Sequence, residues 1–405
     1  MAAHPGADIE VFDWFAPSMR ADPHPALHRL RARSAVHRND LGWWILGYEE
    51  ADRVLHGPGF GRRRERFLET FRQTLGDGVA YDYVTRRLSY YSAAEHRRIR
   101  GTVARAFTPR RIAMMRPYIT SLAEELLDRV AGAPSFDVLA SLAHPLPSLV
   151  ICQMLGVPEE LRADFDRWTG LIPHLIAPKV TPEQLEEGTR AVIEEWACVE
   201  RLVEERRSRP GDDLLTALIE AEEGGQRLTH DELIANVIFL FSAGHQTTRD
   251  SLGMGLLGML EPRDAYTALV RDPSLAAAAA EETLRWGSVV ALSIDQAQED
   301  VDLAGAHLSP GDDVWILLPA ANRDPAKFPD PDSFRLDRPH DQRHLSFSAG
   351  PHHCLGAALG RLELTVLLEV LARRLPDAVL ADQELEWRDT VFFRGVRSLR
   401  IAPHG

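Results

Sequence analysis

The stretch Phe347-Ser-Ala-Gly350-Pro-His352-His-Cys354-Leu-Gly356 carries more information than any other part of this 405-residue chain. It places Cys354 in a loop bracketed by glycines, directly before a predicted helix from Leu355 to Arg374. The loop N–H groups and the positive end of the helix dipole both stabilise an anionic sulfur. The sequence therefore predicts a lowered pKa for Cys354 and a ligand for a soft metal. Gly350 and Gly356 would let the backbone approach a flat cofactor. An isolated cysteine is more often an inert buried thiol, but the spaced agreement of the whole stretch favours the metal ligand.

The composition narrows the class of protein. Apolar residues make up 45% of the chain, and the formal net charge is −14. A chain this acidic is a poor match for nucleic acid or an anionic membrane as its main partner. Cys152, Cys198 and Cys354 form no C-x-x-C pair, which argues against a disulfide framework or a zinc site and favours a reducing compartment. No apolar stretch is long enough for a signal peptide or a membrane anchor, so we expect a cytoplasmic protein.

The chain reads as one continuous domain, residues 1–405, because it has no internal repeat and no Gly/Ser-rich linker. Short strands are expected in a hairpin at 36–38 and 43–46, and at 289–294, 301–303 and 314–317. The apolar pattern lapses between Gly57 and Ala94, which we interpret as a long functional or mobile loop. From Asn322 to Ser346 a meander rich in Pro and Asp leads into the Cys354 loop. Periodic apolar segments predict helices near 24–33, 48–56, 95–107, 110–131, 137–155, 158–170, 183–208, 212–222, 230–260, 263–271 and 273–286.

One predicted helix is unusually long. Thr229-His-Asp-Glu232 has the form of a capping box and predicts the start of a helix of about thirty residues, ~45 Å in length. In its middle lies Ala243-Gly244-His245-Gln246-Thr247-Thr248. A mid-helix glycine costs about 1 kcal/mol relative to alanine, so Gly244 needs a reason. Its missing side chain would open room for a small ligand near Thr247. A core helix with a tolerated glycine is the equally weighted alternative.

The Cys354 loop resembles the haem-binding loop of the cytochrome P450 family, and the order of elements resembles that family over essentially the whole chain. The resemblance implies a mainly α, single-domain cytochrome P450 fold, with many helices around a haem and small β-sheets. It implies heme b (iron protoporphyrin IX) as the cofactor, with the Cys354 thiolate as the iron ligand. Phe347, Gly350 and Gly356 would support the cofactor from the same loop.

The segment from Ala243 to Thr248 resembles the oxygen-binding motif of the family's central helix. By that resemblance Ala243, Gly244, Gln246 and Thr247 would form the catalytic group, in which Thr247 helps to deliver protons to O2. Gln246 stands where the family usually has Glu or Asp, and an amide cannot donate a proton as a carboxylic acid does. Asp250 lies on roughly the same helix face and is a hypothetical substitute acting through water. An ion pair between Asp250 and a neighbouring arginine is the simpler alternative.

Glu282 and Arg285 match the family's Glu-x-x-Arg pair, which locks the meander beside the haem. Other pairs in this chain, such as Glu204 and Arg207, have the same spacing, so position alone selects these two. Arg338 is a candidate third member of the network.

His96, Arg100 and His352 resemble the family's contacts with the haem propionates. A further propionate arginine is expected ten residues after Arg285, where this chain has Asp295. An aspartate beside a propionate is repulsive. Either it is protonated, or it turns toward the substrate pocket, or the strand register differs. We favour the second option, which predicts a substrate with a cationic or donor-rich group. The resemblance also places in the substrate pocket Phe239, Ser242, Val289, Val290, Ser293 and Asp295.

The function implied by the resemblance is a haem-thiolate monooxygenase of secondary metabolism, which inserts one oxygen atom of O2 into a small organic substrate. The sequence has no flavin or iron–sulfur motif, so electrons are expected from a ferredoxin and its ferredoxin reductase. A basic patch would suit such an acidic partner, although it is equally consistent with ordinary surface charge. Two alternatives remain: oxidative coupling or ring formation on the same scaffold, of which Gln246 and Asp295 are mild hints, and a haem-binding sensor without turnover. The basic patch named above as a docking site for the ferredoxin comprises Arg105, Arg110, Arg111 and Arg361.

Overall fold

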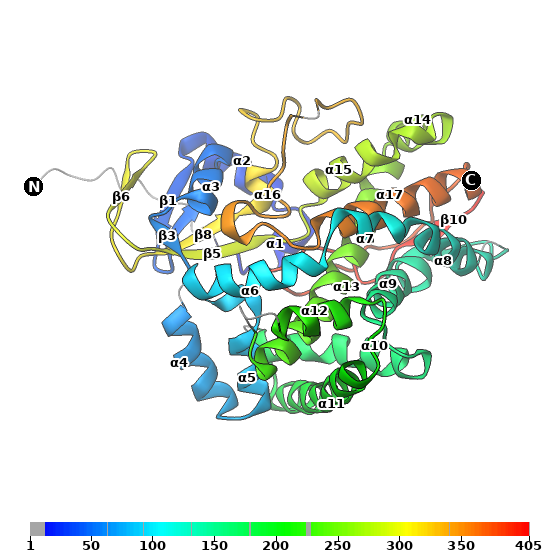
Figure 1. Cartoon of the computed structure of the whole chain (residues 1–405). Coiled ribbons are helices and arrows are strands. Elements are labelled where there is room, and N and C mark those ends of the chain that lie inside the picture. The colour runs from blue at the N-terminus through cyan, green and yellow to red at the C-terminus, as the bar shows by residue number, and fades with distance from the viewer. Residues whose placement is uncertain are drawn as a thin grey trace, which may run out of the picture.

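The computed structural model describes residues 13–404, except 63, 92, 131, 178–179, 224–227 and 340. Figure 1 shows a large helical body with the main sheet at one side of it. The helices are α1 (Ser18–Ala21), α2 (His24–Arg33), α3 (Tyr48–His56), α4 (Arg64–Leu75), α5 (Val79–Arg86), α6 (Ala93–Ala106), α7 (Pro109–Met114), α8 (Arg116–Asp128), α9 (Pro145–Leu155), α10 (Arg162–Leu171), α11 (Pro182–Ser208), α12 (Leu214–Glu223), α13 (His230–Leu260), α14 (Asp264–Arg271), α15 (Ala276–Gly287), α16 (Leu318–Ala321) and α17 (Ala357–Arg374). The strands are β1 (Val36–Asn39), β2 (Gly42–Ile45), β3 (Phe60–Gly61), β4 (Phe136–Asp137), β5 (Leu292–Ala297), β6 (Val301–Leu303), β7 (Ala306–Leu308), β8 (Asp313–Leu317), β9 (Val379–Leu380) and β10 (Arg400–Ala402).

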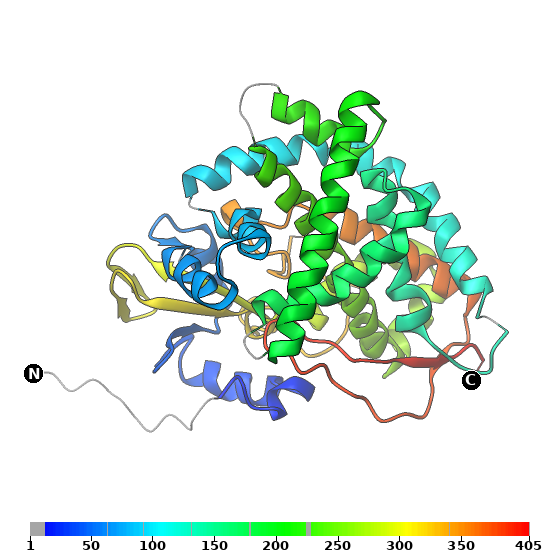
Figure 2. The same ribbon diagram turned by 90° about the horizontal axis from the view of Figure 1, so that it is seen from below.

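The long helix α13 lies in the middle of the helical body (Figure 1), and in the view from below it runs behind α11 (Figure 2). The predicted capping box starts it: the Glu232 N–H donates to the Thr229 hydroxyl at 3.2 Å, and the Thr229 N–H donates to the Glu232 carboxylate at 2.8 Å. Helix α15 packs closely against α13 because Gly255 has no side chain. A Cβ at that position would lie 2.4 Å from Thr283 Oγ1. Since α13 also contacts α5, α9 and α17, it connects the elements that form the site.

The main sheet joins distant parts of the chain in the order β1-β2-β8-β5-β3. β1 and β2 form the expected hairpin, and β2 pairs in parallel with β8. The rings of Trp44 and Trp315 stack with centroids 5.2 Å apart, which ties β2 to β8. β5 pairs antiparallel with β8 on one side and with the short β3 on the other, so residues 60–61 lie beside 296–297.

The interpretation of residues 57–94 as one long loop was wrong. Helices α4 and α5 and a short turn at Leu88–Tyr90 fill this segment. Its buried face consists largely of aromatic rings set among arginines, for instance Phe71 and Tyr83, so the aliphatic period is weak. Residues 63 and 92 lie outside the described part.

Three predicted helix boundaries also needed correction. The helix expected at 110–131 is divided into α7 and α8, with Pro117 in the first turn of the second. Residue 131 lies outside the described part. In the segment 137–155 the α-helix starts only at Pro145. α17 starts at Ala357, with Gly356 at the N-cap position, and not at Leu355. None of the described helices combines the length and the apolar character that crossing a bilayer requires.

Candidate active site

A cavity of about 450 Å³ lies between α13, the Cys354 loop and the strands that follow α15. An adjoining cavity of about 220 Å³ shares Thr247, Phe347, His352 and Cys354 with it. Cys354 therefore opens onto a space that suits an organic molecule of drug size. The apolar wall of the first cavity includes Phe67, Phe71, Tyr90, Phe239, Val289, Val290, Leu292, Phe392 and Phe393.

Cys354 is held by its own loop. Its N–H donates to the Phe347 carbonyl oxygen at 2.8 Å, and the Gly356 N–H donates to the sulfur. The prediction of a lowered pKa was wrong. Burial raises the pKa of the Cys354 thiol more than the Gly356 N–H, Arg100 and Arg361 lower it. A bound metal cation would favour the thiolate, because its charge deprotonates a coordinating thiol.

The glycines near the cavities are needed for different structural reasons. Gly350 has φ 61°, and a Cβ there would lie 2.3 Å from the Leu55 carbonyl oxygen of α3. This close approach to α3 is a requirement for glycine at position 350 that the sequence did not indicate, and the expected role of Gly350 beside a cofactor stays a prediction. Gly356 does line the second cavity. At Gly244 an added Cβ meets nothing within 4 Å, so open space lies beside α13 where the sequence predicted room.

Of the four residues of α13 predicted to be catalytic, three line the cavity and one does not. Ala243, Gly244 and Thr247 line the second cavity, and the Thr247 hydroxyl donates to the Ala243 carbonyl oxygen at 3.0 Å. Gln246 does not belong to the described lining of either cavity. Its amide hydrogen-bonds the Asp250 carboxylate instead.

Asp250 forms ion pairs with neighbouring arginines, as the simpler alternative to a proton-transfer role predicted. The side chain is buried, contacts the Arg249 guanidinium, and lies 3.7 Å from Arg388 Nη1. Burial raises the pKa of Asp250, while Arg388, Arg249 and Gln246 lower it. Its contact with Gln246 connects Asp250 to the segment from Ala243 to Thr248.

His245 turns away from the cavities. Its Nε2 donates to the His144 carbonyl oxygen at 2.9 Å, and the His144 Nε2 lies 3.1 Å from Asp166 Oδ2. Within the described part of the chain, these three side chains are the one group with a metal-like arrangement. Because the carbonyl oxygen already uses His245 Nε2, the cluster is a polar contact between α10, α13 and the residue before α9.

Four basic side chains line one part of the second cavity: Arg62, His96, Arg100 and His352. The two imidazole rings lie 4.1 Å apart, and Arg100 donates to the His353 carbonyl oxygen at 2.6 Å. Burial, Arg100 and Arg62 lower the pKa of His96 to about 4. Burial, Arg62, His96 and Arg100 lower the pKa of His352 to about 3. Such a group of donors fits the carboxylates of a bound molecule.

Two residues predicted for the substrate pocket lie elsewhere. Asp295 is buried in β5, its Oδ1 lies 3.2 Å from Arg62 Nη1, and it lines neither cavity. The prediction of a cationic substrate facing Asp295 was therefore wrong, because Arg62 already neutralises the carboxylate. Ser242 contacts the Tyr83 hydroxyl at 3.3 Å, also outside both linings. The predicted residues that do line the first cavity are Phe239, Val289, Val290 and Ser293.

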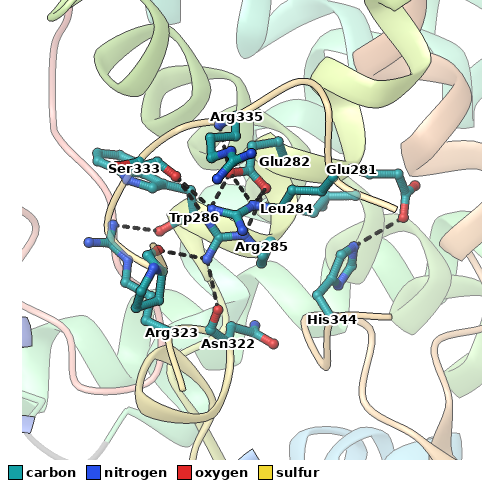
Figure 3. A network of polar contacts seen from close by, with 12 residues as sticks. Glu281, Glu282, Leu284, Arg285, Trp286, Asn322, Arg323, Ser333, Arg335 and His344 are labelled. Carbon is teal, nitrogen blue, oxygen red and sulfur yellow. Dashed lines mark hydrogen bonds and ion pairs between the residues drawn. The ribbon is translucent and has the colours of Figure 1, made fainter. Parts of the chain in front are cut away.

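Glu282 and Arg285 form a buried ion pair near the end of α15 (Figure 3). The Arg285 guanidinium donates to both carboxylate oxygens of Glu282 at 2.7 Å. Arg338 Nε donates to the same carboxylate at 2.9 Å and is the third member. The network fixes the meander to α15 and thereby places the Cys354 loop. The other acceptors of Arg285 are the carbonyl oxygens of Asn322, Pro331 and Ser333.

The sequence reasoning missed two charged residues of the cavity wall, Arg62 and Glu363. Arg62 belongs to a run of arginines, and nothing local distinguishes it from its neighbours. Glu363 lies on α17, is buried, and accepts a hydrogen bond from the Thr248 hydroxyl at 3.3 Å. Burial raises the pKa of Glu363 to about 8. An acid within the apolar run of α17 was the available signal, but Glu369 in the same run shares it, so the sequence did not single out Glu363.

Glu363→Gln is expected to flatten the pH dependence of stability. The raised pKa means that folded Glu363 binds a proton between pH 4.5 and about 8 which the unfolded chain releases. The free energy of unfolding therefore falls as pH rises through this window, and the amide removes that contribution. Urea unfolding of the holoprotein at several pH values measures it. Glu369→Gln on the same helix, where the carboxylate pairs with Arg116 at 2.8 Å, should keep the wild-type slope. An unchanged slope in Glu363→Gln contradicts a neutral Glu363.

The comparisons with known proteins agree with this geometry. The family model for cytochrome P450 matches residues 45–376. The chain is 37% identical over 393 residues to cytochrome P450 107B1 of Saccharopolyspora erythraea, covering 95% of this chain and 93% of that protein. It is 36% identical over 393 residues to the cytochrome P450 monooxygenase PikC of Streptomyces venezuelae, covering 94% and 91%. The solved structure of CalO2 matches with a TM-score of 0.92 and 30% identity, covering 98% of this chain and 100% of that one.

Proteins of this family bind haem, and the described residues fit that group. A cysteine sulfur opens onto the cavities, basic donors line one part of the wall, and open space lies beside Gly244. Arg62 Nε is buried without a hydrogen-bond partner, so an added acceptor would satisfy it. The fold, the site and the relatives together establish that this chain is an enzyme of the cytochrome P450 family, which uses haem, O2 and redox partners.

Proposed function

We propose that the protein is a monooxygenase that inserts one oxygen atom of O2 into a small, largely apolar organic substrate. The observation that carries this function is that Cys354 and three residues of α13, Ala243, Gly244 and Thr247, open onto the same apolar cavity system. The names of its relatives, among them a monooxygenase and a hydroxylase, support oxygen insertion. Another relative is named for polyketide biosynthesis, which supports secondary metabolism and a polyketide-like substrate.

Bound haem supplies the activation of O2, and the chain supplies position, donors and exclusion of water. Cys354 would ligate the iron of bound haem, while Phe347 and Gly356 would shape the loop around the sulfur. The Thr247 hydroxyl would exchange its bond to the Ala243 carbonyl oxygen for one to water in the cavity, and would relay a proton there by accepting one from a water as it donates its own. Gln246 interacts with the buried Asp250 carboxyl outside the described cavity linings, so we assign it no proton transfer. His96, Arg100 and His352 would hold the propionates, and the substrate would lie against Phe239, Val289, Val290 and Ser293.

Oxidative coupling or ring formation without oxygen insertion is the second candidate. It is favoured by Gln246, whose amide cannot act as the distal acid and which hydrogen-bonds Asp250 outside the cavity lining. The two reactions differ in product mass, because insertion adds an oxygen atom and coupling removes hydrogen atoms.

Electrons come from a ferredoxin and a ferredoxin reductase in this proposal, with docking near Arg105 and Arg110, which are both exposed. Arg361 and Arg111 are weaker candidates, because Arg361 pairs with Glu281 and Arg111 lies 3.6 Å from Asp212. Docking through exposed charges weakens with salt. The three cysteines are unpaired, in keeping with a reducing cytoplasm.

Thr247→Ala is expected to lower the product formed per reductant consumed by about tenfold or more, because the proton donor at the oxygen site is lost. The assay supplies ferredoxin, its reductase, NADPH and isotopically labelled O2, with macrolactones that shift the ferric spin state. Labelled product from wild type supports the monooxygenase. Unlabelled product that has lost hydrogen identifies the coupling reaction, and no reductant use with any ligand supports the sensor. Thr120→Ala is the control, because the Thr120 hydroxyl of α8 makes the same kind of bond to the Arg116 carbonyl oxygen at an exposed position, outside both cavities. If Thr247→Ala and Thr120→Ala form equal amounts of product per reductant consumed, the role of Thr247 is contradicted.

A further inference from the structure

We propose that Arg62, oriented by the buried Asp295, binds a haem propionate and thereby takes the place of the arginine that the family usually carries at the position of Asp295. The proposal depends on haem binding and does not depend on the proposed oxygen insertion. It makes Arg62 a cofactor-binding residue and Asp295 a positioning residue.

The register of the sheet brings the two side chains together. β3 pairs antiparallel with β5, with Phe60 opposite Ala297 and Gly61 opposite Gln296. Arg62 is the next residue along this register and therefore lies beside Asp295. Their side chains are only 17% and 8% exposed, with Arg62 Nη1 3.2 Å from Asp295 Oδ1. A cation and an anion have thus exchanged places across this strand pair, relative to the pattern expected from the family.

The hydrogen bonds of Arg62 leave one edge of the guanidinium unused. Nη1 donates to the Ile294 carbonyl oxygen at 2.9 Å and to the Ser293 hydroxyl at 3.1 Å, in addition to its contact with Asp295. Nε is buried and has no hydrogen-bond partner. A buried donor without an acceptor costs about 1–3 kcal/mol, so an acceptor from another molecule is favoured here. The Nε edge of a guanidinium matches the two oxygens of a carboxylate.

The position of Arg62 relative to the cavities indicates which carboxylate it meets. Arg62 lines both cavities, and in the second it shares the wall with His96, Arg100, His352 and Cys354. Arg62 and Arg100 are permanently charged, so Arg62 supplies half of the fixed positive charge in this group. A porphyrin whose iron lies at the Cys354 sulfur carries its propionates at the rim, where these donors gather. Asp295 keeps Arg62 in this orientation from the protein side.

The test is a comparison of haem dissociation rates, measured as transfer from the ferric holoprotein to excess apomyoglobin. Arg62→Met is expected to lose haem about ten- to a hundredfold faster than wild type, as the loss of one charged hydrogen-bonded pair implies. Arg66→Met is the matched control, because Arg66 is exposed, lies in the adjacent α4 and pairs with Asp313 at 2.9 Å. Arg66→Met should retain haem as wild type does. Wild-type retention in Arg62→Met, or equal loss in Arg66→Met, overturns the proposal.

Two further measurements separate propionate binding from a merely structural role. Reconstitution with haem dimethyl ester removes the carboxylate charges, so wild type and Arg62→Met should then lose the cofactor at nearly equal rates. A difference that persists with the ester means that Arg62 only supports the strand pair. The exchanged variant, Arg62→Asp combined with Asp295→Arg, should retain haem better than Arg62→Asp alone, because it restores a cation on β5. No recovery in the exchanged variant, together with a persistent ester difference, refutes the assignment.

Discussion

Cys354→Ser is expected to abolish the reduced carbon monoxide band that is typical of thiolate-ligated haem, and with it all turnover. A serine hydroxyl is a poor ligand for the iron, and the sulfur is the one soft donor that opens onto the described cavities. The basic side chains at the cavity edge remain, so the variant should bind haem more weakly rather than lose it altogether. The measurements are the reduced carbon monoxide difference spectrum and the haem content after gel filtration.

Cys198→Ala serves as the control for Cys354→Ser. Cys198 is a buried thiol on α11, outside both described linings. Its replacement should cost some stability and leave the carbon monoxide spectrum unchanged. A thiolate-type spectrum in Cys354→Ser would overturn the assigned ligand and everything proposed about the reaction.

Arg285→Met is expected to destabilise the protein by about 3–5 kcal/mol, because it leaves the buried Glu282 carboxylate without its closest cation. Arg285 is 2% exposed, and its hydrogen bonds join α15 to the meander that leads into the Cys354 loop. Haem content should fall together with stability, because the loop loses its support. Urea unfolding of the holoprotein and the haem-to-protein ratio measure the two effects.

Arg207→Met tests whether burial, and not spacing, makes the Glu282–Arg285 ion pair important for stability. Glu204 and Arg207 have the same three-residue spacing, at 2.6 Å, but the Glu204 carboxylate is 62% exposed. Water screens such a pair, so the loss should be about 1 kcal/mol or less. Similar losses in Arg285→Met and Arg207→Met would mean that the Glu282 network does not secure the meander.

Elements whose local pattern agrees with their surroundings could be predicted from the sequence. The capping box at Thr229 and Glu232, followed by a long apolar run, predicted the observed bounds of α13. The segment with α4 and α5 could not be predicted in the same way. Its buried face depends on ring contacts such as that of Phe67 with Tyr90, at 5.1 Å between centroids, and these form only when the helices and the turn meet.

In the candidate site, too, only features that depend on consecutive residues could be predicted from the sequence. The position of Cys354 before a helix and the run from Ala243 to Thr247 could be predicted, because each chemical pattern lies within a few consecutive residues. The outward turn of Gln246 toward Asp250 could not, since it depends on which neighbours pack around α13.

By itself, the sequence determined the family, the sulfur that opens onto the cavity, the central helix and the Glu282–Arg285 pair, because these depend on residues close together in the chain. Only the tertiary structure decided that Arg62 is the partner of Asp295, that Gly350 makes room for α3, and that burial raises the pKa values of Cys354 and Glu363. The physical reason is that charge pairing and ionisation depend on groups from distant parts of the chain and on the exclusion of water, and both arise only when the chain has folded.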